Sequence, residues 1–265
     1  MLVNLVKSSA VKLFGIAVRL GVDRLPGFHR TYLTLYPVYK RYFEAGPIDR
    51  LRAFVPAGSA VIDVGANVGF FALRFADWVG RDGRVIAIEP DLQNFESLVS
   101  ALRRADLLDR VSAVKAIAAD EPGTKYLELN PLHPADHKLS RDDSGVPVTA
   151  ITLDELAREH DANRPALVKI DVQGAEMLVL RGMIEILDVA GPVLFIELSE
   201  KALGSFGSSV TAVLDLLQSK GYVPYWLTRT GHKAADRHEI HAKISVDEYT
   251  DVLFIKPHHN TSRDC

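Results

Sequence analysis

From residue 59 onward, short apolar runs alternate with longer segments whose apolar residues recur at helical spacing. Short apolar runs bounded by turn residues are typical of buried strands, and a 3.6-residue period is typical of helices packed on one face. This alternation predicts an α/β fold, a mostly parallel sheet with helices on both faces. The predicted strands are 60–64, 84–89, 111–116, 125–130, 146–151, 166–170, 192–198, 222–227 and 251–256, and the predicted helices are 70–79, 92–108, 175–187 and 210–220.

Two helix starts carry capping signals. Asp91 precedes the helix predicted over 92–108 and can accept a hydrogen bond from its first turn. A further short helix begins after Thr152, and Glu155 stands three residues later, as in a capping box.

Residues 1–45 precede the alternating region and are predicted to form an N-terminal helical appendage or lid. Within residues 1–20 the apolar positions fit one helical face, but Lys7, Lys12 and Arg19 interrupt the run. A secretory signal or a membrane span would need an uninterrupted apolar core. Two interpretations stay open: packing on the domain or on a second copy in a homo-oligomer, and peripheral attachment to a membrane.

The remaining boundaries follow from composition. Residues 46–257 form the predicted catalytic domain, and the polar, aperiodic segment 258–265 is predicted to be disordered. The 265 residues include 48% hydrophobic and 25% charged residues, which is typical of a globular protein. The formal net charge of -3 provides no global field to hold nucleic acid, which leaves only a local basic patch open.

Cys265 is the single cysteine of the sequence, so an internal disulfide framework and a thiolate zinc cluster are excluded. This composition predicts a cytoplasmic protein, with the inner face of the membrane as the place of any peripheral contact.

Acidic residues follow the ends of the predicted parallel strands. In open sheets of this kind, ligands bind beyond the carboxyl ends of the strands, where the strand order reverses. Carboxylates at such positions are more often functional than structural, because an unpaired buried charge is costly. The acids at these ends are Asp63, Glu89, Asp120, Asp171 and Glu197.

The loop after the first strand, residues 63–69, is rich in glycine. It lacks the Gly-Lys-Ser/Thr ending of a phosphate-binding loop, and Asn67 occupies the second glycine position of the dinucleotide fingerprint. Glu89 follows Gly69 by twenty residues, where an acid can accept hydrogen bonds from both hydroxyls of a ribose. These features predict an adenosine-type cofactor, either NAD or S-adenosylmethionine, and the missing glycine disfavours NAD.

Several segments, in the same order, resemble the motifs of the FkbM family of S-adenosylmethionine-dependent methyltransferases. The most characteristic is Lys169-Ile170-Asp171-Val172-Gln173-Gly174-Ala175-Glu176, followed by Leu180-Arg181-Gly182. The other matching segments are 61–71, 88–98, 152–154 and 194–197. The resemblance implies the class I methyltransferase fold, Rossmann-like, with a seven-stranded sheet whose last strand is antiparallel. The strands 222–227 and 251–256 would form the antiparallel pair.

The resemblance also implies roles in cofactor binding. Gly65, Asn67 and Gly69 would line the methionine part of S-adenosylmethionine, and Asp63 would orient its amino group. Glu89 would hold the ribose. Residues Ala118 to Asp120 would contact the adenine, although Asp120 can equally be an ordinary acid of the turn that follows it.

Asp171 is predicted to lie nearest to the transferred methyl group and to contribute both to cofactor binding and to catalysis. Transfer to a hydroxyl requires positioning and removal of the hydroxyl proton. Asp171, Glu197 and a loop histidine, His137 or His133, are candidates for the base. Glu176 is either a helix-capping acid or a catalytic one. A magnesium ion held by Asp171 and Glu197 with His137 or Asp136 stays open.

The function predicted from these features is O-methylation of a sugar hydroxyl in a polysaccharide, a glycolipid or a glycosylated natural product. The alternatives are a non-catalytic cofactor-binding or membrane-associated assembly protein and, more remotely, an NAD-dependent oxidoreductase. Acceptor choice would depend on three segments, which are the aromatic-rich part of residues 22–57, the loop 131–145 and the insertion 228–248. The insertion is predicted to be a solvated flap.

Overall fold

The computed structural model describes residues 48–128, 138–140 and 144–257. The predicted N-terminal appendage, the predicted disordered tail and His137 lie outside the described residues. The predicted domain boundaries at residues 45 and 257 therefore stay predictions.

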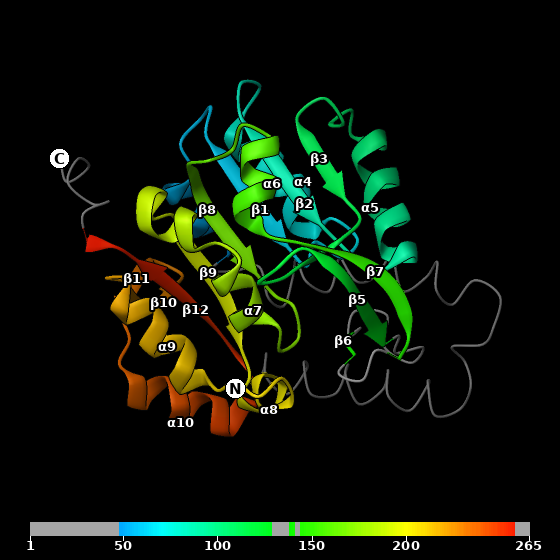
Figure 1. Cartoon of the computed structure of the whole chain (residues 1–265). Coiled ribbons are helices and arrows are strands. Elements are labelled where there is room, and N and C mark those ends of the chain that lie inside the picture. The colour runs from blue at the N-terminus through cyan, green and yellow to red at the C-terminus, as the bar shows by residue number, and fades with distance from the viewer. Residues whose placement is uncertain (1–47, 129–137, 141–143, 258–265) are drawn as a thin grey trace, which may run out of the picture.

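An eight-stranded sheet forms the centre of the molecule (Figure 1). Its order is β11-β10-β12-β9-β8-β1-β2-β3, and the five strands from β9 to β3 are parallel to one another. β12 is antiparallel to both β9 and β10, as predicted, and β11 is antiparallel to β10. The strand bounds are β1 (Ala60–Val64), β2 (Arg84–Ile88), β3 (Val111–Val114), β8 (Pro165–Ile170), β9 (Val193–Leu198), β10 (Val223–Thr228), β11 (Gly231–Ala234) and β12 (Thr250–Ile255).

The prediction of seven strands and a flap at 228–248 was wrong. A hairpin through Thr230 folds β11 back along β10, so this segment adds an eighth strand to the sheet edge. The remainder of the segment forms α10 (Arg237–Asp247), which buries Ile240 and Ile244 against the core. The polar composition of the segment obscured these two apolar residues, four positions apart on one helical face.

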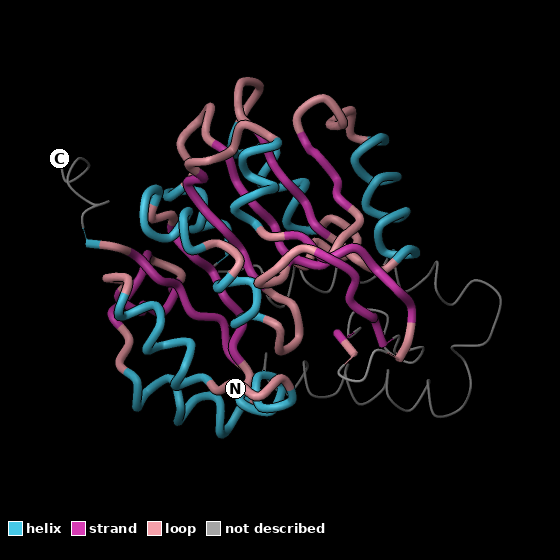
Figure 2. The backbone as a smooth tube through the Cα atoms, in the orientation of Figure 1, coloured by secondary structure: helices cyan, strands magenta, loops and turns pink. Residues whose placement is uncertain are grey.

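Helices cover both faces of the sheet (Figure 2). Apolar residues of α6, α7, α8, α9 and α10 join one core cluster, and those of α4 and α5 join the other. The helices not yet given bounds are α4 (Phe70–Val79), α5 (Leu92–Arg104), α6 (Leu153–Glu159), α7 (Glu176–Arg181), α8 (Glu200–Ser205) and α9 (Val210–Ser219), with a 3-10 turn at Asp49–Phe54 and a π-helical turn at Ile186–Ala190.

The two cores follow from the period of two along each strand. In β1, Ile62 and Val64 belong to the cluster with α6 and α7, while Val61 belongs to the cluster with α4 and α5. Since alternate side chains point to opposite faces, Asp63 lies on the α4 face between apolar neighbours. It is fully buried there, which makes it the polar exception in an apolar strand.

A second sheet, with the order β4-β7-β5-β6, is inserted between β3 and β8 in the sequence. Its bounds are β4 (Ile117–Ala118), β5 (Gly123–Glu128), β6 (Lys138–Leu139) and β7 (Val146–Ile151). The predicted pair of strands is confirmed, because β5 and β7 are antiparallel neighbours. β4 pairs with the end of β7 and thereby fixes the backbone at Ala118.

Both predicted caps are confirmed. Asp91 accepts a hydrogen bond from the Asn94 amide at 2.9 Å. The Thr152 hydroxyl accepts from the Glu155 amide at 3.2 Å and donates to the Glu155 carboxylate at 2.9 Å. The helix after Asp91 ends earlier than predicted, because Asp106 adopts a left-handed φ of 56° that turns the chain.

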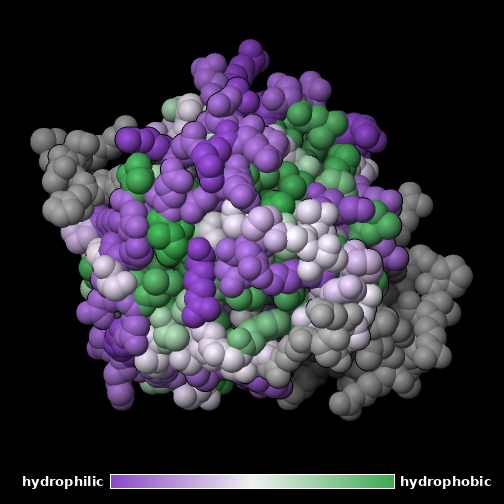
Figure 3. All heavy atoms as spheres, in the orientation of Figure 1, coloured by the Kyte–Doolittle hydropathy of each residue, from purple (hydrophilic) through white to green (hydrophobic). Residues whose placement is uncertain are grey.

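In the described part of the chain, no helix is long and apolar enough to cross a bilayer. Figure 3 shows hydrophobic residues scattered among hydrophilic ones on the visible face. The exposed large hydrophobic residues among those described are Leu92, Leu108, Val146, Val189, Val246 and Tyr249.

Candidate active site

The strand order reverses between β1 and β8. The chain proceeds outward from β1 through β2 to β3 and then returns to β8 on the other side of β1. At this point the Asp171 amide donates to the Val64 carbonyl at 3.1 Å. Gly65 has a φ of 77°, and a Cβ there would lie 1.9 Å from the Asp171 carbonyl oxygen. Only glycine permits this close approach, so the two predicted site segments meet at the carboxyl edge of the sheet.

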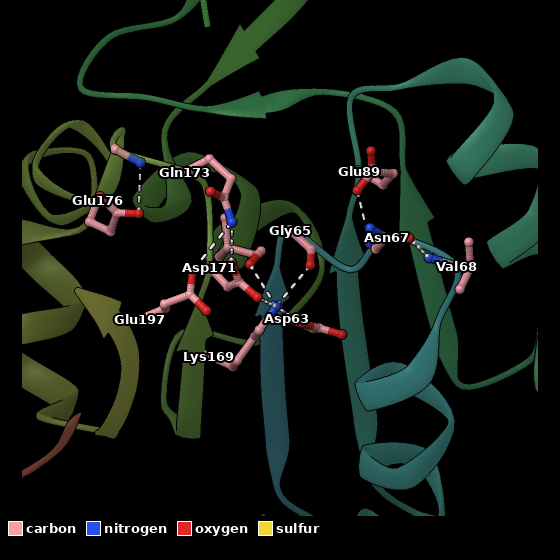
Figure 4. A network of polar contacts seen from close by, with 12 residues as sticks. Asp63, Gly65, Asn67, Val68, Glu89, Lys169, Asp171, Gln173, Glu176 and Glu197 are labelled. Carbon is pink, nitrogen blue, oxygen red and sulfur yellow. Dashed lines mark hydrogen bonds and ion pairs between the residues drawn. The ribbon is translucent and has the colours of Figure 1, made fainter. Parts of the chain in front are cut away.

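Glu89 organises the glycine-rich loop. One of its carboxylate oxygens accepts from the Asn67 amide at 2.8 Å, and the other accepts from the Asp91 amide at 3.0 Å. Asn67 adopts a left-handed φ of 50°, and its own side chain accepts from the next amide, that of Val68. Gly69 closes the turn at the start of α4. The predicted cofactor loop is thus tied to the predicted ribose acid (Figure 4).

The environment of Glu89 changes its acidity. Burial raises its pKa from 4.5 to about 7, against the lowering effect of the Asp91 and Asn67 amides. The Asn67 and Asp91 amides and the Asn94 side chain all donate to this carboxylate. These three hydrogen bonds occupy three of the four lone pairs of its two oxygens, so one acceptor position is left for a hydroxyl donor.

Lys169 is the cation of the site and was absent from the predicted site residues. It is buried, and its position in β8 is the register partner of Asp63 in β1. Its Nζ lies 3.4 Å from an Asp63 oxygen and 3.5 Å from an Asp171 oxygen, and it donates to the Gly65 carbonyl at 2.8 Å. The Phe71 ring lies 5.1 Å from the same nitrogen. One ammonium therefore links two acids and the glycine-rich loop.

Asp63 differs in position from the other predicted cofactor residues. Its side chain has no exposed surface and pairs with Lys169. An acid placed in this way acts on the loop through the ammonium group of Lys169. A direct contact with the cofactor amino group stays a prediction.

Asp171 and Glu197 are brought together at the ends of β8 and β9. The Gln173 Nε2 lies 3.4 Å from an Asp171 oxygen and 3.2 Å from a Glu197 oxygen (Figure 4). All three side chains are partly exposed. Gln173 was also missed from the sequence, where an amide in a loop carries no signal until its neighbours in space are known.

Glu176 folds back over the loop that precedes its helix. One of its oxygens accepts from the Gly174 amide at 3.0 Å, so the acid binds the loop backbone that precedes α7. Whether its role is capping or catalytic stays a prediction. Burial, aided by the negative charge of Asp171, raises its pKa from 4.5 to about 7. It is buried beneath the site, while Asp171 and Glu197 are the partly exposed acids.

The segment predicted to contact adenine, residues 118–120, packs against the end of α7. A Cβ at Gly182 would lie 1.9 Å from the Ala119 carbonyl, so the end of α7 packs directly on this backbone. Ala118 is buried in β4. Asp120 is one-third exposed and lies 4.0 Å from the Lys125 ammonium, a contact expected of a turn acid.

The Thr152-Leu153-Asp154 motif supports the same region. The Asp154 carboxylate accepts from the amides of Glu185 and Ile186, both at 2.9 Å. Its own amide donates to the Gly182 carbonyl at 3.0 Å. This motif therefore connects α6 to the end of α7.

A metal centre finds no support in the described residues. They contain no group of three or more His, Cys, Asp or Glu side chains arranged to hold an ion. His137, which was a candidate both for the base and for a metal ligand, lies outside them.

Comparison with known proteins places this geometry in a family. The model of the methyltransferase FkbM domain matches residues 63–224, more than half of the chain. The chain belongs to the FkbM methyltransferase family. Of the two cofactors left open by the sequence, this assignment favours S-adenosylmethionine.

Individual relatives agree with the family. The chain is 30% identical over 122 residues to the hexuronic acid methyltransferase AglP of Haloferax volcanii, a match that covers 46% of this chain and 48% of AglP. The FkbM methyltransferase structure from Methylobacillus flagellatus is similar with a TM-score of 0.50 at 18% identity, covering 75% of this chain and 44% of that one. The chain thus matches about half the length of each of these relatives, and the structural likeness confirms the FkbM fold.

Proposed function

We propose that this FkbM methyltransferase transfers a methyl group from S-adenosylmethionine to a hydroxyl group of a sugar. The observation that carries the proposal is the pairing of Asp171 and Glu197 around Gln173, at the strand ends beside the glycine-rich loop. A hydroxyl acceptor has to lose its proton, and a carboxylate positioned at the reaction centre can receive it.

The residues present fit S-adenosylmethionine. Glu89 retains one acceptor position for a ribose hydroxyl. The turn through Gly65, Asn67 and Gly69 brings the backbone close to the point where the strand order reverses. Asp171 lies directly beyond that loop. We assign the methionine part of the cofactor to the loop and the adenine to the side of Ala118 and Asp120.

The reaction divides into binding, positioning and proton removal. When bound, the cofactor supplies a methyl group on a positively charged sulfur, which retains the electrons of the broken S–C bond. The acceptor oxygen forms the new C–O bond, and its proton passes to Asp171 or Glu197. The protein contributes the orientation of the acceptor, which is the main requirement of such an in-line transfer.

Two observations support a sugar as the acceptor. The match to AglP, whose name describes a hexuronic acid methyltransferase, suggests carbohydrate chemistry. The two carboxylates also favour a neutral, hydroxyl-rich acceptor over an anionic one, because like charges repel in a partly buried site. We therefore expect methyl ethers of neutral sugars rather than methyl esters of hexuronates.

The test uses the whole protein with tritiated S-adenosylmethionine and separate neutral and hexuronate-containing oligosaccharides. Methyl esters release their label in mild alkali, whereas methyl ethers retain it. Alkali-stable label on neutral sugars, with turnover lowered more than cofactor affinity in Asp171→Ala, supports the proposal. Label that alkali removes, or full turnover by Asp171→Ala, contradicts it.

Two further proposals rest on the sequence alone. One is that residues 1–20 contact a membrane, and the other is that the protein associates with itself. Co-sedimentation with anionic vesicles and light scattering, each with and without residues 1–20, would test them.

A further inference from the structure

Gln173 occupies the centre of the acidic pair. Its amide nitrogen has two N–H donors, and the two carboxylates nearest to it are Asp171 at 3.4 Å and Glu197 at 3.2 Å. Figure 4 shows both carboxylates directed toward this nitrogen from two neighbouring strands. One neutral group therefore contacts both acids of the proposed reaction centre.

The backbone at this position is held in an unfavourable conformation. Gln173 has a φ of 54°, in the left-handed region that residues with a Cβ rarely adopt. Such conformations persist where the surroundings enforce them, and they concentrate at functional sites.

The surroundings that enforce it are visible in the structure. A Cβ on Gly174 would lie 2.4 Å from the Ala202 carbonyl of α8, so the loop is pressed against that helix. The Glu176 carboxylate holds the Gly174 amide from the other side at 3.0 Å. The loop is thus pinned in a conformation that directs the Gln173 side chain toward the two acids.

The electrostatic consequence follows from the donor character of the amide. Two carboxylates close together disfavour each other's ionisation, and a hydrogen bond donated to the charged form favours it. An amide between them therefore favours the ionised form of both groups and orients them. Asp171 also faces the Lys169 ammonium at 3.5 Å and the buried Glu176 carboxyl group.

We propose that Gln173 is a positioning residue that holds Asp171 and Glu197 as a pair of ionised hydrogen-bond acceptors for two hydroxyl groups of one acceptor molecule. This inference rests on the proposed function and narrows its substrate class to polyhydroxyl compounds. One hydroxyl group of the acceptor would bind one carboxylate, and the neighbouring hydroxyl group of the same molecule would bind the other.

The test measures the two acids directly, without a known acceptor. Carbon-13 NMR of side-chain carboxyl groups, assigned with Asp171→Asn and Glu197→Gln, gives both titration midpoints in the wild type and in Gln173→Leu. We expect at least one midpoint to rise by about one pH unit or more when the amide is removed. Gln218→Leu, which changes an exposed glutamine on α9 that contacts Arg237, is the matched control and leaves both midpoints in place.

A second variant keeps the inference testable if Gln173→Leu does not fold. Gln173→Glu places a third carboxyl group between the two acids, so one of the three has to hold its proton to a higher pH. The double variant Gln173→Glu/Glu197→Gln again leaves one amide next to two carboxyl groups, and the low midpoints return. A merely structural role of Gln173 would not produce this recovery.

The outcomes separate this inference from the proposed function. Unchanged midpoints in both Gln173 variants overturn the positioning role, even if the wild type transfers methyl groups. Wild-type protein that binds S-adenosylmethionine but labels no hydroxyl compound contradicts the proposed function, whatever the midpoints show. If the midpoints shift and label is transferred to alcohols with a single hydroxyl as readily as to sugars, the two-hydroxyl part of the inference is wrong.

Discussion

The burial of Glu176 beneath the site predicts how the free energy of unfolding changes with pH. Glu176 is 3% exposed, one oxygen accepts from the Gly174 amide, and the other is buried without a hydrogen-bond partner in the structure described. Burial raises its pKa from 4.5 to about 7. In the unfolded chain the same group is in water and ionises near its ordinary value.

The sign of the effect follows from the two protonation equilibria. Between pH 4.5 and about 7, folded Glu176 keeps its proton while the unfolded chain releases it. The contribution of Glu176 to the free energy of unfolding is therefore fully present below pH 4.5 and is lost as the pH rises through 7. Because one pKa unit corresponds to about 1.4 kcal/mol, the loss amounts to about 3 kcal/mol of unfolding free energy.

The perturbation that isolates this contribution is Glu176→Gln. The amide oxygen can still accept from the Gly174 amide, while the added N–H₂ group brings a cost that does not depend on pH. We therefore expect the free energy of unfolding of the variant, relative to the wild type, to improve by about 2.5 kcal/mol between pH 5 and pH 8, since part of the loss has already occurred at pH 5.

Urea unfolding followed by circular dichroism at pH 5, 6, 7 and 8 measures this difference. Glu96→Gln, at an exposed position on α5, is the matched control and should differ from the wild type by less than about 0.5 kcal/mol throughout. If the difference between Glu176→Gln and the wild type is the same at pH 5 and at pH 8, the burial argument is refuted.

Three further predictions concern the residues around the reversal point. Glu89→Gln should weaken S-adenosylmethionine binding by about 1–3 kcal/mol in calorimetry, and wild-type affinity should rise as the pH increases through 7, where Glu89 becomes ionised. Lys169→Met should lower the unfolding free energy by about 3–5 kcal/mol in urea, because Asp63 then loses its buried counter-charge. Adding Asp63→Asn should recover part of that loss, and no recovery would refute the pairing. Gly65→Ala should cost at least about 2 kcal/mol in the same assay, because its Cβ would meet the Asp171 carbonyl.

The sequence predicts much of this fold for a physical reason. Strands buried on both faces are nearly continuous apolar runs, and helices on such a sheet repeat at 3.6 residues, so both are visible locally. The segment 228–248 was mispredicted because α10 has charged and histidine residues around two buried isoleucines. Its apolar face is too narrow to stand out from a polar loop.

The site was predictable in position but less so in its contacts. The acids at the strand ends are visible because a parallel sheet collects those ends at one edge. The pairing of Lys169 with Asp63 depends on the register between β1 and β8, two strands that lie a hundred residues apart. A lysine inside the apolar run 166–170 is the signal that could have revealed it, because a buried ammonium requires an acidic partner.

The most characteristic motif of the chain can now be explained residue by residue. Along β8 and the following loop, Lys169 points to the α4 face and binds the glycine-rich loop, while Ile170 points to the opposite core. Asp171 and Gln173 then reach the reaction centre, and Glu176 holds the backbone between them and α7. These roles depend on the spacing of the residues. Along the strand, successive side chains point to opposite faces, and the loop after the strand turns Gln173 back toward Asp171. An insertion of one residue between Lys169 and Asp171 would place one of them on the wrong face, so the motif should tolerate substitutions better than changes of length.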